Sequence, residues 1–311
     1  PPRSTLFPYT TLFRSIAAYQ DLGYHFLALT DLDQAPLQSL REKPGLSLIR
    51  GQEVHTWQGH YLLLGTGDAI PWLEEKNVRD LSFLVQDTHA QGGLFCVLHP
   101  YALGWSDGWD VPRFVGDRWS RVDLLEVWPG LWKNRFPEIL KTLDLWDTLL
   151  NRGWRVVGVC GKGYAGELTD AYIQQLPKLL VMSESLYEDD LLAALKMGHS
   201  YMTLEPAVGF WAESQVGGAM MGDELRLSIS APYLLRITVS QMERCFIRIK
   251  SNTGILCEMP LPSTRDADLK FTLRALPQIQ WFRLEIYRYG RPLDTLVALT
   301  NPLFVRGMVS I

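Results

Sequence analysis

Two patterns of apolar and polar positions follow one another along the chain, and the change falls near residue 204. Before it, short apolar runs have the length of buried strands, at residues 25–30, 46–50, 61–64, 94–98, 122–127, 155–160 and 179–182. Segments of helical character lie among them, at residues 16–22, 78–91, 136–151 and 187–197. Strands that alternate with helices predict a parallel sheet or barrel.

After residue 204 the helical pattern disappears. Short strands separated by turn residues are predicted at 225–230, 234–240, 245–250, 255–259, 269–273, 281–289 and 296–298. Such a series is typical of a β-sandwich. We therefore expect two domains, an α/β domain over residues 16–204 and a β-sandwich over residues 205–311.

The first fifteen residues have two interpretations, a translated sequencing adapter, which we favour, and a short native strand and turn. Residues 5–15 read Thr-Leu-Phe-Pro-Tyr-Thr-Thr-Leu-Phe-Arg-Ser, which resembles the translation of a DNA-sequencing adapter. We interpret residues 1–15 as an artefact and exclude them from the prediction of the fold. The natural protein then begins upstream of Ile16, so the sequence predicts no compartment.

The composition of the chain argues against several classes of function. The 311 residues carry a net charge of −4 without a basic cluster, which argues against a nucleic-acid partner. No stretch approaches the roughly 18 apolar residues of a membrane span, so we expect a soluble protein without a membrane partner. The four cysteines form no CxxC pair, and no disulfide is expected.

The stretch from residue 51 to residue 60 carries the richest candidate chemistry. It joins two apolar runs as a polar corner and holds Glu53, His55 and His60. Glu53 and His55 are two positions apart, so on a regular strand they face the same side. His99 follows another predicted strand, and Asp31 follows a third. Parallel α/β folds place their sites at the carboxyl ends of strands.

Six motifs in this order resemble the PHP (polymerase and histidinol phosphatase) metallohydrolase family, in the branch with a C-terminal immunoglobulin-like sandwich. They are Gly23-Tyr24 with residues 27–31, Gly51-Gln52-Glu53 with Gly59-His60, Gly92-Gly93 with His99-Pro100, Leu125-Glu126-Val127-Trp128, residues 192–201, and Leu299-Thr300-Asn301-Pro302. The resemblance implies a PHP-like (β/α)7-type barrel, which is a TIM-like barrel, truncated at its N-terminus and followed by an all-β sandwich.

The resemblance also implies two or three divalent metals and phosphoester hydrolysis, but the ligand set is depleted. The family's first His-x-His motif would lie upstream of Ile16. Leu32 stands where the second motif has a ligand histidine, and Gly163 and Ala165 stand at the ligand positions of the last motif. The surviving candidate metal ligands are Glu53, His60 and His99.

Several interpretations of these residues stay open. Glu53, His60 and His99 hold one divalent metal (Zn, Mn or Fe), because three protein ligands and a water make a catalytic zinc shell; otherwise they form an inherited hydrogen-bonded cluster that holds none. The substitute or supporting candidates are Asp31, Asp33, His55, Lys162 and Glu126. Lys162 is hypothesised to replace lost metal charge by pairing with Glu53 or Asp31, since a buried carboxylate needs a counter-charge. The alternative is an exposed loop lysine.

Two functions are consistent with the sequence. The first is a degenerate family member without hydrolase activity, which binds a small, phosphate-containing ligand or acts as a regulatory or assembly protein. The second is a metal-dependent phosphoesterase with a reduced metal site. The five tryptophans between residues 105 and 132 are either a stacking platform or, as we favour, packed core. The sequence does not predict the oligomeric state.

Overall fold

The computed structural model describes residues 16–32, 45–56, 59–70, 73–74, 77–78, 81–101, 116–161, 173–228, 231–262, 265–274, 276–291 and 293–308. The stretch that resembles a translated adapter lies outside these residues, as do the segments 33–44, 102–115 and 162–172.

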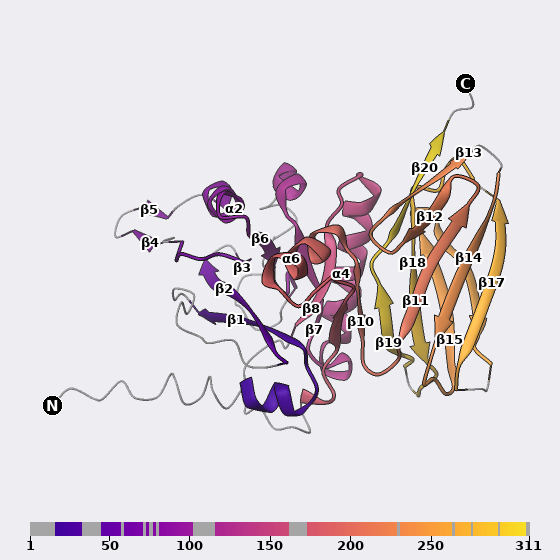
Figure 1. Ribbon diagram of the computed structural model, residues 1–311, viewed down its shortest axis with the longest axis horizontal. Coiled ribbons are helices and arrows are strands. Elements are labelled where there is room, and N and C mark those ends of the chain that lie inside the picture. The colour runs from indigo at the N-terminus through magenta and orange to yellow at the C-terminus, as the bar shows by residue number, and fades with distance from the viewer. Residues whose placement is uncertain are drawn as a thin grey trace.

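A six-stranded mixed sheet forms the first part of the fold, in the order β1–β2–β3–β6–β7–β8 (Figure 1). The strands are β1 (Phe26–Leu32), β2 (Ser47–Thr56), β3 (Gly59–Leu64), β6 (Leu94–Val97), β7 (Leu124–Pro129) and β8 (Val157–Gly161). Strand β3 runs antiparallel to both of its neighbours, and the other pairs are parallel. Strands β6 and β7 are buried along their whole length. The uninterrupted apolar sequence of β6 predicts this, whereas β7 buries Glu126 among its apolar residues. Strands β4 (Leu73–Glu74) and β5 (Asn77–Val78), of two residues each, pair antiparallel and stand apart from this sheet.

Helices connect or flank these strands. They are α2 (Leu81–Ala90), α4 (Trp132–Asn151), α6 (Glu188–Met197), the 3-10 helix η1 (Gly116–Arg121) and a short helix over residues 16–21. Helix α6 has three acidic residues in its first turn, which favours its N-terminus electrostatically. It ends at Gly198 with a left-handed φ of 78°, the helix-terminating glycine that the sequence predicts.

Helix α4 lies against β7 and reaches β8 through the side chain of Trp146. Its buried positions Ile139, Leu143, Trp146 and Leu150 recur at helical spacing and form one apolar face. The ring of Trp146 lies where a Cβ at Gly158 would stand, and its indole nitrogen donates to the carbonyl oxygen of Val156 at 2.8 Å. Glycine at position 158 therefore allows the helix to approach the strand.

The second part of the fold consists of two sheets. The larger has the order β13–β20–β18–β19–β10–β9, and β15 joins it beside β18 and carries β16. Its strands are β9 (Lys178–Val181), β10 (Ser200–Thr203), β13 (Glu224–Ser228), β15 (Cys245–Ser251), β16 (Gly254–Pro260), β18 (Trp281–Arg288), β19 (Thr295–Thr300) and β20 (Leu303–Met308). The smaller has the order β12–β11–β14–β17, with β11 (Val208–Ser214), β12 (Gly217–Met220), β14 (Pro232–Val239) and β17 (Ala267–Arg274).

These two sheets share one apolar core. Phe210 and Leu235 of the smaller sheet lie in the same buried cluster as Ile247 and Leu284 of the larger one. The strands are seen side by side in orange and yellow in Figure 1. Among the described residues after residue 204 there are strands and no helix. Strands β9 and β10 precede residue 205 in sequence but belong to the larger of these sheets.

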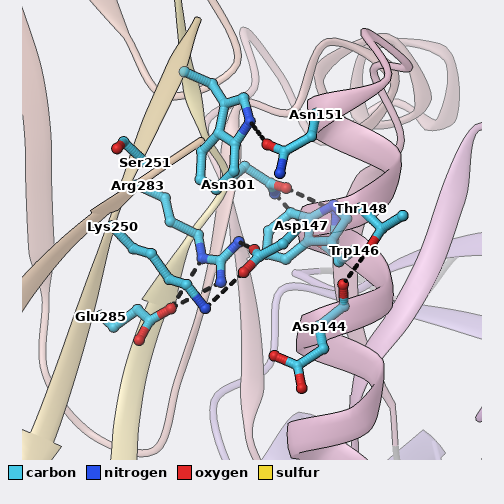
Figure 2. Close-up of polar contacts among 12 residues, drawn as sticks. Asp144, Trp146, Asp147, Thr148, Asn151, Lys250, Ser251, Arg283, Glu285 and Asn301 are labelled. Carbon is cyan, nitrogen blue, oxygen red and sulfur yellow. Dashed lines mark hydrogen bonds and ion pairs between the residues drawn. The ribbon is translucent and has the colours of Figure 1, made fainter. Parts of the chain in front are cut away.

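A buried asparagine joins the two parts. The side-chain oxygen of Asn301 accepts from the backbone nitrogen of Gly158 at 2.8 Å, and its side-chain nitrogen donates to the carbonyl oxygen of Ser200 at 2.9 Å. A second contact joins α4 to β15 and β18 through ion pairs (Figure 2). These contacts fix the C-terminal sheets against the helix that covers the first sheet.

The prediction of a (β/α)7-type or TIM-like barrel is wrong. The described residues are mostly β-strand, with few helices, and the first sheet is open and mixed. The stretch 51–60 is not a corner that follows a strand, because β2 extends to Thr56 and residues from Gly59 onward form β3, which pairs antiparallel with β2. A barrel of parallel strands needs a crossover at that point. Strands β9 and β10, which would continue the first sheet, pair with each other instead, and β10 pairs with β19.

None of the helices in the described part of the chain combines the length and the apolar character needed to cross a membrane.

Candidate metal centre

The hairpin of β2 and β3 brings three polar side chains together. Glu53 and His55 lie two positions apart on β2, and His60 on β3 pairs directly with His55 across the ladder. The imidazole rings of His55 and His60 stack with centroids 3.5 Å apart at an interplanar angle of 9°. A ring nitrogen of His55 lies 2.8 Å from a carboxylate oxygen of Glu53. The period of the strand thus places both β2 side chains on one side, as the sequence predicts.

His99 approaches the same point from the end of β6. The backbone nitrogen of Leu98 donates to the carbonyl oxygen of His60 at 3.0 Å, which extends the β3–β6 ladder beyond the strand. The next residue, His99, presents its ring edge-on to the His60 ring at a centroid distance of 4.9 Å. Glu53, His60 and His99 each offer one ligand atom, and these atoms lie within 4.8 Å of one another.

Burial keeps two of the imidazoles neutral. It lowers the pKa of His60 to about 3, and the charges of His55 and His99 act in the same direction. Burial also lowers the pKa of His99, although the carboxylate of Glu53 opposes the shift. A neutral imidazole has a lone pair to give to a metal, so both side chains are in the ligand form at neutral pH.

Glu126 lies beside the cluster at the bulge of β7. Its carboxylate accepts a hydrogen bond from the backbone nitrogen of His99 at 2.9 Å, and the residue is only 4% exposed. Burial, helped by the charge of Glu53, raises the pKa of Glu126 to about 7, while the His99 hydrogen bond and the charge of Arg135 oppose the rise. This carboxyl group therefore changes its protonation near neutral pH.

Three of the predicted site residues lie partly or wholly outside the described residues. The backbone of Asp31 pairs with Gln52 at the end of β1, but its side chain lies outside the described residues. Asp33 and Lys162 lie outside them entirely, as do Gly163 and Ala165. The proposed pairing of Lys162 with Glu53 or Asp31 stays a prediction.

Two residues near the site were missed from the sequence. Arg135 lies in the first turn of α4, and its positive charge acts on both His99 and Glu126. Gly161 ends β8, and a Cβ there would overlap the carboxylate of Glu126. No sequence signal marks Arg135, and Gly161 is marked only as the start of the stretch that resembles the family's last motif. Their closeness to Glu126 depends on which strands and helices become neighbours.

Other candidates in this part of the chain belong to the core. Trp119, Trp128 and Trp132 are buried in the apolar cluster of the first sheet, as the packed-core interpretation predicts, while Trp105 and Trp109 lie outside the described residues. Burial raises the pKa of the Cys96 and Cys160 thiols, so neither has the depressed pKa of a nucleophile.

The chain matches no protein-family model, and comparison with curated proteins finds no significant match.

Proposed function

We propose that this protein binds one divalent metal ion through Glu53, His60 and His99, and that the bound ion holds a small, phosphate-containing ligand for a binding or regulatory role. The observation that carries the proposal is the convergence of these three ligand atoms within 4.8 Å of one another. They come from β2, from β3 and from the end of β6, three adjacent positions of one sheet.

The donor set fits such an ion. Two neutral imidazoles and one carboxylate form the protein ligands of many zinc sites and of non-haem iron(II) sites. Ligand atoms around a tetrahedral zinc ion lie about 3.3 Å apart, so the side chains need only small movements. The hydrogen bond from His55 to Glu53 restrains the carboxylate in the way that outer residues orient metal ligands.

The depleted ligand set argues for binding rather than for hydrolysis by a multi-metal site. Two-metal hydrolysis needs ligands enough for both ions. In the described part of the chain, the cluster has three ligand residues. Membership of the PHP family remains part of this proposal; its support is the order of the motifs in the sequence and the proximity of their Glu53, His60 and His99.

Glu126 favours a second candidate, a one-metal phosphoesterase. A bound divalent metal would act as a Lewis acid towards a phosphoryl oxygen. A carboxyl group with a pKa of about 7 is suited to accept and return a proton at neutral pH. Glu126 has that property and lies one hydrogen bond from the backbone of His99.

Elemental analysis of purified protein tests metal binding. We expect about one equivalent of zinc, manganese or iron per chain, which His60→Ala removes. His25→Ala is the matched control, because His25 is exposed and lies outside the cluster. A metal content that is unchanged in His60→Ala, or that falls equally in His25→Ala, would contradict the assignment.

A hydrolysis assay separates the two functions. Wild-type protein loaded with manganese is incubated with a generic phosphodiester, next to Glu126→Gln and His60→Ala. Binding without catalysis predicts that all three proteins give only the background rate. Turnover that is lost in both variants would favour the phosphoesterase. Protection of the wild-type protein against thermal unfolding by inorganic phosphate, only in the presence of metal, is expected from the binding role.

A further inference from the structure

The backbone of His99 has an unusual conformation. Its φ is +24°, in the region that side chains other than glycine rarely adopt. Such a backbone is strained and persists only where its surroundings hold it. The ring of His99 faces His60 in this conformation. The surroundings of His99 therefore decide whether the third ligand atom reaches the cluster.

The restraint on His99 comes from Glu126. Its carboxylate oxygen accepts from the backbone nitrogen of His99 at 2.9 Å, immediately at the strained residue. Glu126 is 4% exposed and is not itself one of the three clustered ligand residues. Burying a carboxylate costs free energy unless hydrogen bonds compensate for the lost hydration. The hydrogen bond from His99 is such a compensation.

The backbone of β7 directs this carboxylate. The ladder between β7 and β8 shifts register between Glu126 and Trp128, so one residue of β7 has no partner. Such bulges re-aim side chains and are common beside functional sites. Here the bulge follows directly on the residue that contacts His99.

Gly161 on β8 leaves room for the carboxylate. A Cβ at this position would overlap a carboxylate oxygen of Glu126. Gly161 is not among the described glycines with positive φ, so its backbone does not require glycine. Glycine at position 161 thus leaves room for the carboxylate of Glu126.

We propose that Glu126 is a positioning residue for the metal centre, which holds the His99 backbone so that its imidazole meets Glu53 and His60, and that Gly161 keeps the space for it. The inference rests on the proposed metal binding. Glu126 acts through a hydrogen bond to a ligand residue. The essential property of residue 126 is therefore a side chain long enough to place an acceptor oxygen at the His99 nitrogen, and the charge of that side chain is secondary.

Cobalt(II) binding tests this arrangement, because its absorption spectrum reports the ligand geometry separately from activity. Glu126→Leu keeps the side-chain size but removes the acceptor, and we expect affinity for Co²⁺ about 10–100-fold below wild type, with an altered visible spectrum. Glu126→Gln retains an acceptor oxygen, and we expect it to restore both the spectrum and an affinity within about threefold of wild type.

Gly161→Ala provides an independent test that leaves Glu126 in place. We expect the added methyl group to displace the carboxylate and to weaken Co²⁺ binding about as much as Glu126→Leu does. Gly307→Ala is its control, because a Cβ at Gly307 meets nothing within 4 Å. Cooperative urea unfolding of each metal-free variant shows that the fold is retained; should Glu126→Leu not fold, Gly161→Ala and Glu126→Gln decide the question.

The outcomes are distinct. Wild-type protein that binds no Co²⁺ overturns the metal function and this inference with it. Wild-type binding with unchanged affinity and spectrum in Glu126→Leu or Gly161→Ala overturns the positioning role alone. Equal weakening in Glu126→Gln and Glu126→Leu would assign the effect to charge and likewise overturn positioning by a hydrogen bond.

Discussion

The guanidinium group of Arg283 on β18 donates to the carboxylate of Asp147 on α4, and this pair joins the C-terminal sheets to the helix that covers the first sheet (Figure 2). Arg283 is fully buried, with its guanidinium carbon 4.7 Å from the ring centre of Trp146 and 5.4 Å from that of Trp281. Its other partner is the carboxylate of Glu285, at 2.8 Å. Because the charge has no access to water, each partner of Arg283 is needed.

Removal of Asp147 should therefore destabilise the protein. Asp147→Ala leaves Arg283 and Lys250 without a shared carboxylate, and we expect a loss of about 3 kcal/mol in the free energy of unfolding, measured in urea. Asp144→Ala on the exposed face of the same helix is the control, with an expected change within about 0.5 kcal/mol. Similar effects of the two substitutions would show that the pair contributes little.

Substitutions at Asn301 and at its partner Ser200 should lower the free energy of unfolding by different amounts. Asn301→Ala leaves a buried backbone donor at Gly158 and a carbonyl at Ser200 without this partner, which costs about 2–4 kcal/mol. Ser200→Ala removes only the contact of the serine hydroxyl with the Asn301 amide, at 3.0 Å, and should cost about 1 kcal/mol. Urea unfolding measures both. A larger loss in Ser200→Ala than in Asn301→Ala would contradict the bridging role of Asn301.

Local periodicity predicts part of the site, and long-range pairing decides the rest. The alternation of side chains along a strand predicts that Glu53 and His55 share a side, which β2 confirms. The direction of β3 is not encoded in that alternation. The polar residues 51–60 predict a corner between two strands, and the alternation of strands and helices predicts parallel pairs. The barrel prediction is wrong because β2 and β3 pair antiparallel.

Strand register gives a second example. A regular hairpin that pairs Lys250 with Ile255 would place Cys245 opposite Pro260. The structure keeps the first pair, but a register shift between Ile249 and Lys250 places Phe246 opposite Pro260. One extra residue in a ladder has no signature in composition or periodicity. The positions of Gly161 and Arg135 beside Glu126 depend in the same way on which elements become neighbours.

The low pKa of His60 makes stability depend on pH in the metal-free protein. Burial lowers this pKa from 6.5 to about 3, so between these values the unfolded chain binds a proton that the folded protein does not. The contribution of this pKa difference to the free energy of unfolding is fully present above about pH 6.5. It is lost as the pH falls, by at most about 1.4 kcal/mol per pH unit.

A comparison of wild-type protein with His60→Gln isolates this effect, because glutamine does not titrate. With a chelator present, we expect the advantage of wild type in unfolding free energy to shrink by up to about 2 kcal/mol between about pH 7 and about pH 5. Urea titrations at both pH values measure it. A difference that stays constant, or that grows as the pH is lowered, would mean that His60 titrates normally in the folded protein.

Metal should stabilise the folded chain through the three clustered residues. A ligand that binds only the folded state at a free concentration of about 100 times its dissociation constant adds about 2.7 kcal/mol to the free energy of unfolding. We expect zinc to give an increase of this size in wild type and in His25→Ala, but none in Glu53→Gln or His99→Ala.

Urea unfolding with zinc and with chelator measures the increment for each protein. Since both measurements use the same variant, any intrinsic loss of stability from the substitution cancels. An increment that survives in His99→Ala would place the metal elsewhere on the chain, because removal of one of three protein ligands should abolish so compact a site.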